Sequence, residues 1–150
     1  MSFILSEVNS SDQASLQALA DSIPYAQFIG LKIILIGDEL TCLLPFKEDN
    51  VGNPMLPALH GGVVSALLEF SAIMQLIGDT KPEHFPKPVN VNVEYLRSAK
   101  PLDTFARAIV TKHGRRVANV RAEAWQTDRN RPIAALHGHF LLAQRETTDG

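Results

Sequence analysis

The segment GGVVSALLEFSAIMQLIG restricts the fold more than any other part of the chain. Its apolar side chains from residue 62 to residue 77 cover almost the whole circumference of a helix, and a helix that is apolar all round has to be buried. Gly78 is the predicted terminator, because glycine readily adopts the left-handed conformation just past a helix end. We therefore predict one long central helix over residues 62–77.

Strand patterns lie on both sides of this helix in the sequence. Residues 31–36 and 40–46 are rich in Ile and Leu and flank a turn at Gly37-Asp38-Glu39, which predicts a hairpin. Beyond the Pro-containing break at residues 81–88, apolar and polar side chains alternate in VNVNVEYL, as they do in a half-buried strand. Strands joined by short turns then form a predicted antiparallel meander over residues 89–95, 104–112, 117–127 and 133–143.

The remaining segments complete the expected fold. A short amphipathic helix is predicted over residues 10–23, capped by Ser10 or Ser11 and ended by Pro24. Residues 48–57 are predicted to form a loop. The fold class is α+β, with an antiparallel sheet of five or six strands wrapped around the buried helix.

Length and composition indicate one globular domain over residues 1–150, with residues 1–10 disordered or loosely packed. The net charge of −2 gives no overall attraction to nucleic acid or to anionic membranes. Cys42 is the only cysteine, which excludes an internal disulfide and a CxxC metal site. Since no signal-peptide pattern or membrane-length apolar run is present, we expect a cytoplasmic protein without a nucleic-acid or membrane partner.

The start of the central helix combines His60 with two glycines, Gly61 and Gly62. The first N–H groups of a helix have no partner within it, and the helix dipole places partial positive charge there. Because glycine has no Cβ, an acyl oxygen can approach these N–H groups, which makes this segment a candidate oxyanion hole. Glu69, surrounded by apolar residues of the same helix, is a candidate nucleophile or general base whose pKa burial would raise.

The spacing of these groups predicts a shared site. Gly61 and Glu69 are eight residues apart, about 12 Å along a helix axis, so they cannot both contact one carbonyl carbon from the same chain. A two-fold dimer with antiparallel helices would bring Gly61 of one chain beside Glu69 of the other, in two equal sites. The residues alone also leave a structural reading open, because paired glycines can relieve packing and a lone glutamate can point outward.

The segment from Asn53 to Glu69 resembles the hotdog-fold acyl-CoA thioesterases of the phenylacetate-degradation (PaaI-like) group. Their pattern is Asn or Gln, then His-Gly-Gly, then Asp or Glu eight residues after the first glycine. The stretches VNVEYLRSAKPLD and KHGRR also resemble family segments, and the resemblance covers most of residues 20–143. It implies a homodimer or a dimer of dimers (a homotetramer) that hydrolyses acyl-CoA to free acid and CoA without a cofactor.

The resemblance also implies residue roles. Glu69 matches the catalytic carboxylate, and the N–H of Gly61 matches the group that polarises the thioester carbonyl. His60 would support that hydrogen-bond network, and Asn53 would hold the nucleophilic water or the substrate. Two departures stand out: the loop from Asn53 to His60 is apparently one residue longer than usual, and Ile73 occupies a position where the family often has Ser or Thr.

Substrate contacts are expected from apolar residues of the helix and from cations near strand ends, because the phosphates of CoA require positive charge. No metal site is expected: His137 and His139 lie on one side of a strand, but no third ligand is evident. The candidate substrate-binding residues are Gly62, Phe70, Ile73, Arg97, Arg115 and Arg116.

Two other functions stay open. A non-catalytic module that binds acyl thioesters or small ligands is compatible with the missing hydroxyl at Ile73. A hydroxyacyl-thioester dehydratase or hydratase would need a histidine and an acid converging on the acyl chain, and His60 at a helix start is poorly placed as a base. His84-Phe85-Pro86 resembles a dehydratase segment, but it follows the helix instead of preceding it and is interpreted as a turn.

Overall fold

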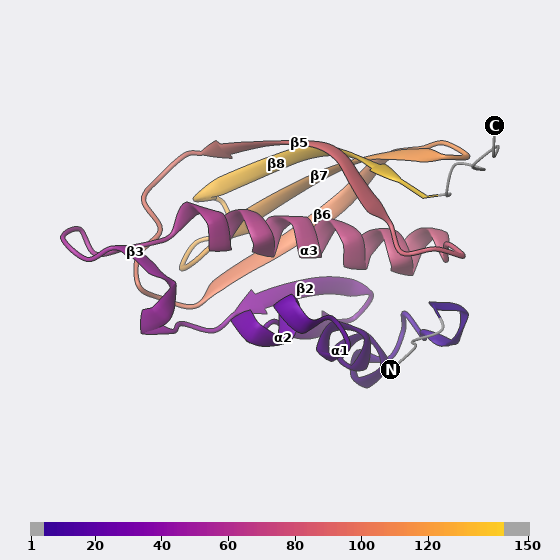
Figure 1. The fold of residues 1–150 in the computed structure, drawn as a ribbon, viewed down its shortest axis with the longest axis horizontal. Coiled ribbons are helices and arrows are strands. Elements are labelled where there is room, and N and C mark those ends of the chain that lie inside the picture. Colours follow the sequence, from indigo (N-terminus) through magenta and orange to yellow (C-terminus); the bar gives the residue numbers. More distant parts are fainter. Residues whose placement is uncertain (1–4, 143–150) are drawn as a thin grey trace, which may run out of the picture.

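A six-stranded antiparallel sheet wraps around one long helix, as Figure 1 shows. The computed structural model describes residues 5–142. The central helix α3 spans Gly61–Thr80 and runs along the concave face of the sheet, while two short helices lie on its other side. The predicted α+β class, with a sheet around one central helix, is confirmed.

The elements follow one another in the order that the sequence patterns indicate, with five short additions before α3, namely two 3-10 turns, one helix and two strands. The main sheet has the strand order β1-β2-β6-β7-β8-β5, and β3 pairs with β4 in a separate hairpin. The helices are α1 (Gln13–Asp21), α2 (Pro24–Ile29) and α3, with 3-10 turns η1 (Leu5–Glu7) and η2 (Glu48–Asn50); the strands are β1 (Lys32–Ile36), β2 (Glu39–Leu44), β3 (Val51–Asn53), β4 (Ala58–Leu59), β5 (Lys87–Tyr95), β6 (Thr104–His113), β7 (Val117–Trp125) and β8 (Ala134–Leu141).

Small side chains on the sheet let α3 lie close to it. The inner face of β6, β7 and β8 is lined largely by buried alanines, whereas α3 contributes large residues such as Leu67, Leu68 and Met74. Although α3 is long and apolar enough by composition to cross a membrane, the sheet and the N-terminal helices cover most of its circumference. The buried alanines are Ala106, Ala108, Ala118, Ala122, Ala124 and Ala134.

The predicted four-strand meander is wrong for its first strand. Strands β6, β7 and β8 are consecutive neighbours, but β5 pairs with β8, so that Tyr95 lies opposite Ala134. Because β5 follows α3, which crosses beneath the sheet, the chain returns at the far edge. Strand β6 is then free to pair with β2, which closes the sheet around the helix.

Strand β5 is also not half-buried in the single chain, as its alternating pattern predicted. It forms an outer edge of the sheet, and three of its apolar side chains are exposed: Val89 by 63%, Val91 by 38% and Tyr95 by 57%. An exposed apolar edge strand offers unpaired backbone groups to another chain.

The predicted limits of the N-terminal helix need correction. Asp12, not Ser10 or Ser11, caps α1, since its carboxylate accepts a hydrogen bond from the Ala14 amide at 3.1 Å. Pro24 begins the separate helix α2, because proline is well suited to the first helical position. Within the stretch expected to be disordered or loosely packed, residues 5–10 are placed, and Leu5 and Val8 pack against the core; residues 1–4 lie outside the described part of the chain.

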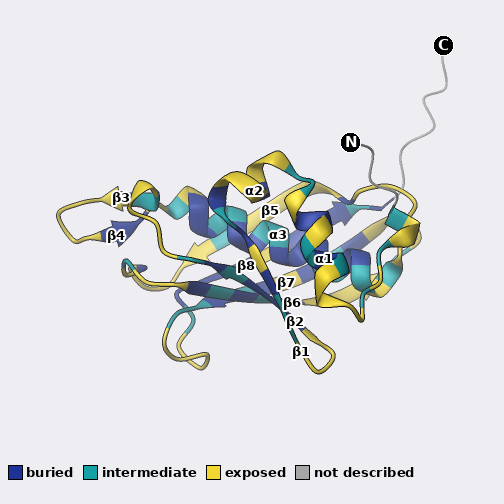
Figure 2. Ribbon diagram, turned by 90° about the horizontal axis from the view of Figure 1, so that it is seen from below, coloured by how far each residue is buried: buried dark blue, intermediate teal, exposed yellow. Residues whose placement is uncertain are grey.

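Helix α3 does not end at Gly78. It continues to Thr80, and Lys81 adopts the left-handed conformation (φ 45°) that ends it. Side-chain hydrogen bonds in the last turn offset the roughly 1 kcal/mol that glycine costs within a helix. The Thr80 hydroxyl donates to the Leu76 carbonyl at 2.7 Å, and the Gln75 side-chain amide donates to the Asp79 carboxylate at 2.9 Å. The segment predicted as a loop over residues 48–57 contains η2 and β3, which belong to a hairpin projecting beyond the start of α3 (Figures 1 and 2).

Candidate active site

His60 organises the first turn of α3. Its backbone N–H donates to the Asn50 carbonyl at 2.7 Å, and its Nδ1 accepts from the Gly62 N–H at 2.8 Å, so the side chain caps the helix. The Val63 and Val64 amides donate to the His60 carbonyl. Of the first four amides of α3, only that of Gly61 has no acceptor within residues 5–142. The fold therefore leaves one helix N–H free for a ligand.

Glycines surround His60 because there is no room for side chains. A Cβ on Gly62 would lie 2.8 Å from His60 Nδ1, and a Cβ on Gly52 would lie 2.7 Å from His60 Cα. Gly52, in β3, is therefore a site-building residue that the sequence patterns did not indicate. Its one available signal was a glycine between Val51 and Asn53 in a segment treated as loop.

Glu69 lies on the incompletely buried face of α3. We call this face the open stripe; its members are not fully covered by the sheet, so the predicted all-round burial does not hold there in the single chain. Glu69 forms no hydrogen bond or ion pair within the described residues, and partial burial raises the pKa of its carboxyl group. The open stripe consists of Gly62, Ser65, Ala66, Glu69 and Phe70.

Gly61 and Glu69 are not brought together within one chain. Both lie in the straight run of α3, eight residues and about 12 Å apart along its axis. A site that uses both groups on one carbonyl requires a second chain.

An aromatic group borders Glu69. The Phe70 ring lies 6.1 Å from that of Tyr25 in α2, and Tyr25 stacks on Phe28 at 6.2 Å. Phe28 is 74% exposed. The sequence indicated Phe70 but missed the two aromatic residues of α2. Ile73, one turn beyond Glu69, is 3% exposed and lies in the core, so a ligand reaches it only if neighbouring side chains move.

Asn53 lies at the projecting hairpin, away from both Gly61 and Glu69 of its own chain. Its Oδ1 accepts hydrogen bonds from the Met55 amide at 3.0 Å and the Leu56 amide at 3.4 Å, which closes the longer loop as a turn. The hairpin tip is apolar and exposed. Asn53 thus orders this loop in the single chain.

The three candidate arginines lie at opposite ends of the sheet. Arg97 and Gly61 line one hollow of about 370 Å³ beside the start of α3, and the Arg97 guanidinium donates to the Pro132 carbonyl. Arg115 and Arg116 line a second hollow, of about 910 Å³, at the β6–β7 turn. The nine residues of β5 separate these ends by about 30 Å.

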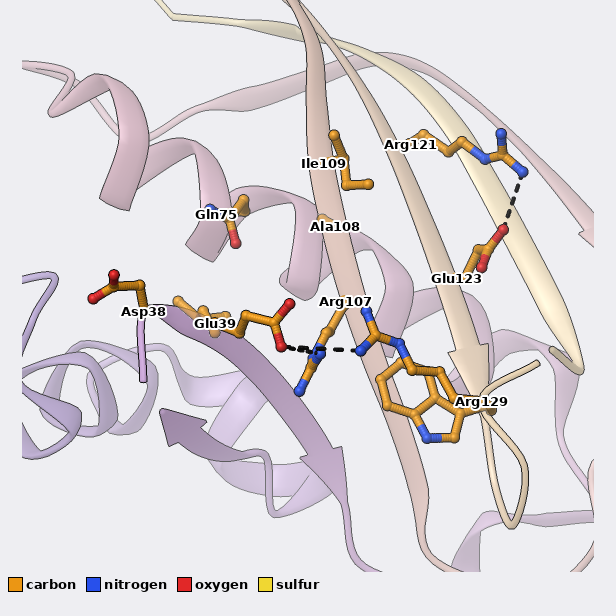
Figure 3. Close-up of a pocket in the computed structure, with 11 residues that line it drawn as sticks. Asp38, Glu39, Gln75, Arg107, Ala108, Ile109, Arg121, Glu123 and Arg129 are labelled. Carbon is orange, nitrogen blue, oxygen red and sulfur yellow. Dashed lines mark hydrogen bonds and ion pairs between the residues drawn. The ribbon is translucent and has the colours of Figure 1, made fainter. Parts of the chain in front are cut away.

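A third hollow, of about 420 Å³, opens between β2 and β6, where their pairing stops at Cys42 and Ala106 (Figure 3). Most of its charges are paired internally: Arg107 contacts Glu39 at 2.5 Å, and Arg121 contacts Glu123 at 3.0 Å. None of the predicted site residues lines it. We interpret this charged slot as a structural network.

Neither Cys42 nor the strand histidines form a reactive centre. Cys42 is fully buried beside the Ser71 hydroxyl, and burial raises the pKa of its thiol to about 12, so it stays protonated. His139 Nδ1 lies 2.8 Å from Asn90 Oδ1 on the outer face of the sheet. Across residues 5–142, no three His, Cys, Asp or Glu side chains are grouped as a metal site requires.

Replacing His60 with alanine is expected to lower the free energy of unfolding by about 1 kcal/mol, because the Gly62 N–H loses its cap. Asparagine at the same position restores an acceptor and should recover most of this loss. Urea unfolding measures both values. Equal stability of His60→Ala and the wild type would contradict the capping role.

Comparison with known proteins identifies the family of the chain. The acyl-CoA thioesterase N-terminal domain family matches residues 52–143. No curated protein matches the chain. A protein of known structure from Chromobacterium violaceum is 34% identical, with a TM-score of 0.72 over 91% of this chain and 95% of that chain.

Two more distant structures show the same fold. A protein from Bacillus halodurans, whose structure contains CoA, is 21% identical, with a TM-score of 0.72 over 93% of this chain and 98% of that chain. A phenylacetic acid degradation-related protein from Ralstonia eutropha is 20% identical, with a TM-score of 0.71 over 84% and 98%. The chain therefore belongs to the acyl-CoA thioesterase N-terminal domain family and has the hotdog fold, a membership that supports acyl-CoA thioester hydrolysis as its general activity.

Proposed function

We propose that the protein hydrolyses acyl-CoA thioesters to the free acid and CoA in sites that two protomers complete together. One observation carries this proposal. Helix α3 has a free amide at Gly61 and a half-buried carboxylate at Glu69, and the two groups are too far apart to act on one carbonyl within a single chain. Two copies with antiparallel helices bring the groups together twice.

The surface of the single chain supports such a dimer. The midpoint between Gly61 and Glu69 is Ser65. Its nearest neighbours on the open stripe, Gly62 and Ala66, are small and allow a second helix to approach closely. Strand β5 adds an exposed apolar edge that pairing with its copy would cover. A two-fold axis beside Ser65 makes both contacts isologous.

In the proposed reaction, the Gly61 N–H of one protomer donates to the thioester carbonyl oxygen and stabilises the negative charge that develops there. Glu69 of the other protomer then acts in one of two ways. As a general base it takes a proton from water while the water oxygen attacks the carbonyl carbon. As a nucleophile it forms an acyl-carboxylate intermediate that water cleaves. In both cases the C–S bond breaks and the CoA thiolate takes up a proton.

His60 supports the donor without acting as a base. Its Nδ1 is occupied by the Gly62 N–H, which leaves the adjacent Gly61 N–H as the donor. This arrangement favours hydrolysis over a dehydratase reaction, in which a histidine nitrogen would face the acyl chain. Gly62 keeps the approach open because it carries no side chain.

The two basic hollows fit the phosphates of one CoA only across the dimer. Arg97 lies beside Gly61 of its own chain, whereas Arg115 and Arg116 lie at the other end of the sheet. A two-fold axis reverses the partner's sheet, so the partner's Arg115 and Arg116 come to the same end as Arg97. We assign the phosphates to these three arginines and the acyl group to Phe70, with Ile73 reached only after neighbouring side chains move. Asn53, on its projecting hairpin, is assigned a contact across the dimer.

The function is tested with the wild-type protein and a panel of aromatic and aliphatic acyl-CoAs, with free thiol measured as it is released. Steady thiol release from at least one class is expected. Saturable binding of acyl-CoA without any thiol release would replace the proposal with the binding-module alternative.

The pH dependence of kcat/KM follows from the raised pKa of Glu69. Only the ionised carboxylate can attack or accept a proton, so activity falls as the pH drops through this pKa. Because burial raises the pKa, the acid limb should lie at higher pH than for an ordinary glutamate. A pH–rate profile of the wild type tests this, and an acid limb at or below the usual glutamate range would contradict it.

A further inference from the structure

Tyr95, the last residue of β5, contacts the start of α3 in two ways. Its hydroxyl donates a hydrogen bond to the Gly61 carbonyl at 2.9 Å. Its ring covers Gly61 so closely that a Cβ on this residue would lie 3.2 Å from two ring carbons. The strand end and the helix start are thus joined at the residue whose amide is free.

We infer that Tyr95 is a positioning residue, which holds the first turn of α3 so that the Gly61 N–H points at the thioester carbonyl. This inference rests on the proposed function. His60 fixes the first turn through the Gly62 amide, and Tyr95 fixes it from the other side through the Gly61 carbonyl. The Gly61 N–H belongs to the His60–Gly61 peptide, whose carbonyl accepts from two amides of the first turn. The contacts of His60 and Tyr95 hold the next peptide, so that rotation about the glycine between the two peptides is restricted from both sides. A donor is most effective when it is already oriented in the free protein.

The exposure of Tyr95 separates this role from a purely structural one. In the single chain the residue is 57% exposed, so removing its hydroxyl should change the stability of the protomer little. The ring stays in Tyr95→Phe, so the apolar contact that β5 offers to a second protomer is kept. A structural contact at the surface would therefore predict no kinetic effect. A positioning contact predicts an effect on kcat, because the oriented N–H acts mainly on the charge that develops in the transition state.

The test compares Tyr95→Phe with the wild type on the acyl-CoA that the wild type hydrolyses fastest. Phenylalanine keeps the ring on Gly61 and removes only the hydroxyl. We expect kcat to fall about tenfold with KM unchanged, which corresponds to the loss of one hydrogen bond. Thr80→Val is the matched control, since it removes a hydroxyl that donates to the Leu76 carbonyl at 2.7 Å at the far end of α3. Its kcat and KM should equal those of the wild type.

A second readout does not depend on turnover. The carbonyl carbon resonance of Gly61 should move upfield in Tyr95→Phe, and the amide resonances of Gly61 and Gly62 should shift with it. If the wild type releases no thiol, the proposed function fails, and these resonances still report whether Tyr95 orients Gly61. The inference is overturned if the Gly61 and Gly62 resonances are unchanged, or if they move while kcat stays at the wild-type value.

Discussion

Glu69→Gln is expected to reduce kcat by about a thousandfold, because glutamine can neither attack a carbonyl nor accept a proton from water. Glutamine has the same shape as glutamate, so the open stripe and the contact between protomers should be kept. The variant should also be at least as stable as the wild type at neutral pH. The raised pKa of Glu69 means that its ionisation opposes folding, and this contribution to stability is lost as the pH rises through the folded-state pKa.

Steady-state kinetics and acyl-CoA binding of Glu69→Gln should be measured together. Retained binding with lost turnover supports the catalytic role. Glu83→Gln is a suitable control, since it removes an exposed carboxylate in the turn after α3, and its kcat should be that of the wild type. Turnover of Glu69→Gln within a few-fold of the wild type would remove Glu69 from the mechanism.

Gly61→Pro is expected to reduce kcat by about a hundredfold relative to Gly61→Ala. Proline removes the one free N–H at the start of α3. It is otherwise compatible with this position, because Gly61 is the first helical residue and His60 has the extended conformation (φ −64°, ψ 131°) that a residue before proline requires. Loss of the donor should therefore occur without loss of the helix.

Gly61→Ala is the matched steric control. Alanine places the same Cβ 3.2 Å from the Tyr95 ring but keeps the N–H. The ratio of kcat between the two variants thus reports the N–H, while the difference between Gly61→Ala and the wild type reports the crowding. Circular dichroism should show the same helix content in both. Equal kcat for the proline and alanine variants would exclude the Gly61 amide as the carbonyl donor.

Local patterns predicted the elements well wherever burial decides them. The run of apolar residues in α3 required a covered helix, and the alternation in β6, β7 and β8 matched one buried face each. Strand β5 shows the same alternation, yet it lies at an edge where nothing in the single chain covers it. The alternation in β5 predicted one covered face, and in the described part of the single chain no element covers it.

Element ends were less predictable because capping depends on tertiary contacts. Glycine is a common helix terminator, but α3 continues past Gly78 to Thr80, with hydrogen bonds from side chains in the last turn. Ser10 and Ser11 are residue types that often cap helices, but the residue whose side chain reaches the first free amides of α1 is Asp12. These misses changed element boundaries and left the architecture intact.

The residues of the candidate site also fall into two groups, those that the sequence indicated and those that only the fold reveals. The sequence indicated His60, Gly61 and Glu69 because their spacing along one helix carries the chemistry. It did not indicate Gly52 or Tyr95, which act on the site from other strands through close approach and a hydrogen bond. Such contacts appear only when the fold is known.

Subunit mixing tests the shared site most directly. Chains carrying Glu69→Gln and chains carrying Gly61→Pro, each with a different affinity tag, are co-expressed, and the hybrid dimer is purified through both tags. Each variant alone should be nearly inactive. In the hybrid, Gly61 of one chain meets Glu69 of the other in one site, and the second site lacks both groups. The hybrid should regain about half of the wild-type activity per dimer. A hybrid as inactive as its two parents, or a protein that proves to be a monomer in solution, would contradict a site shared between protomers.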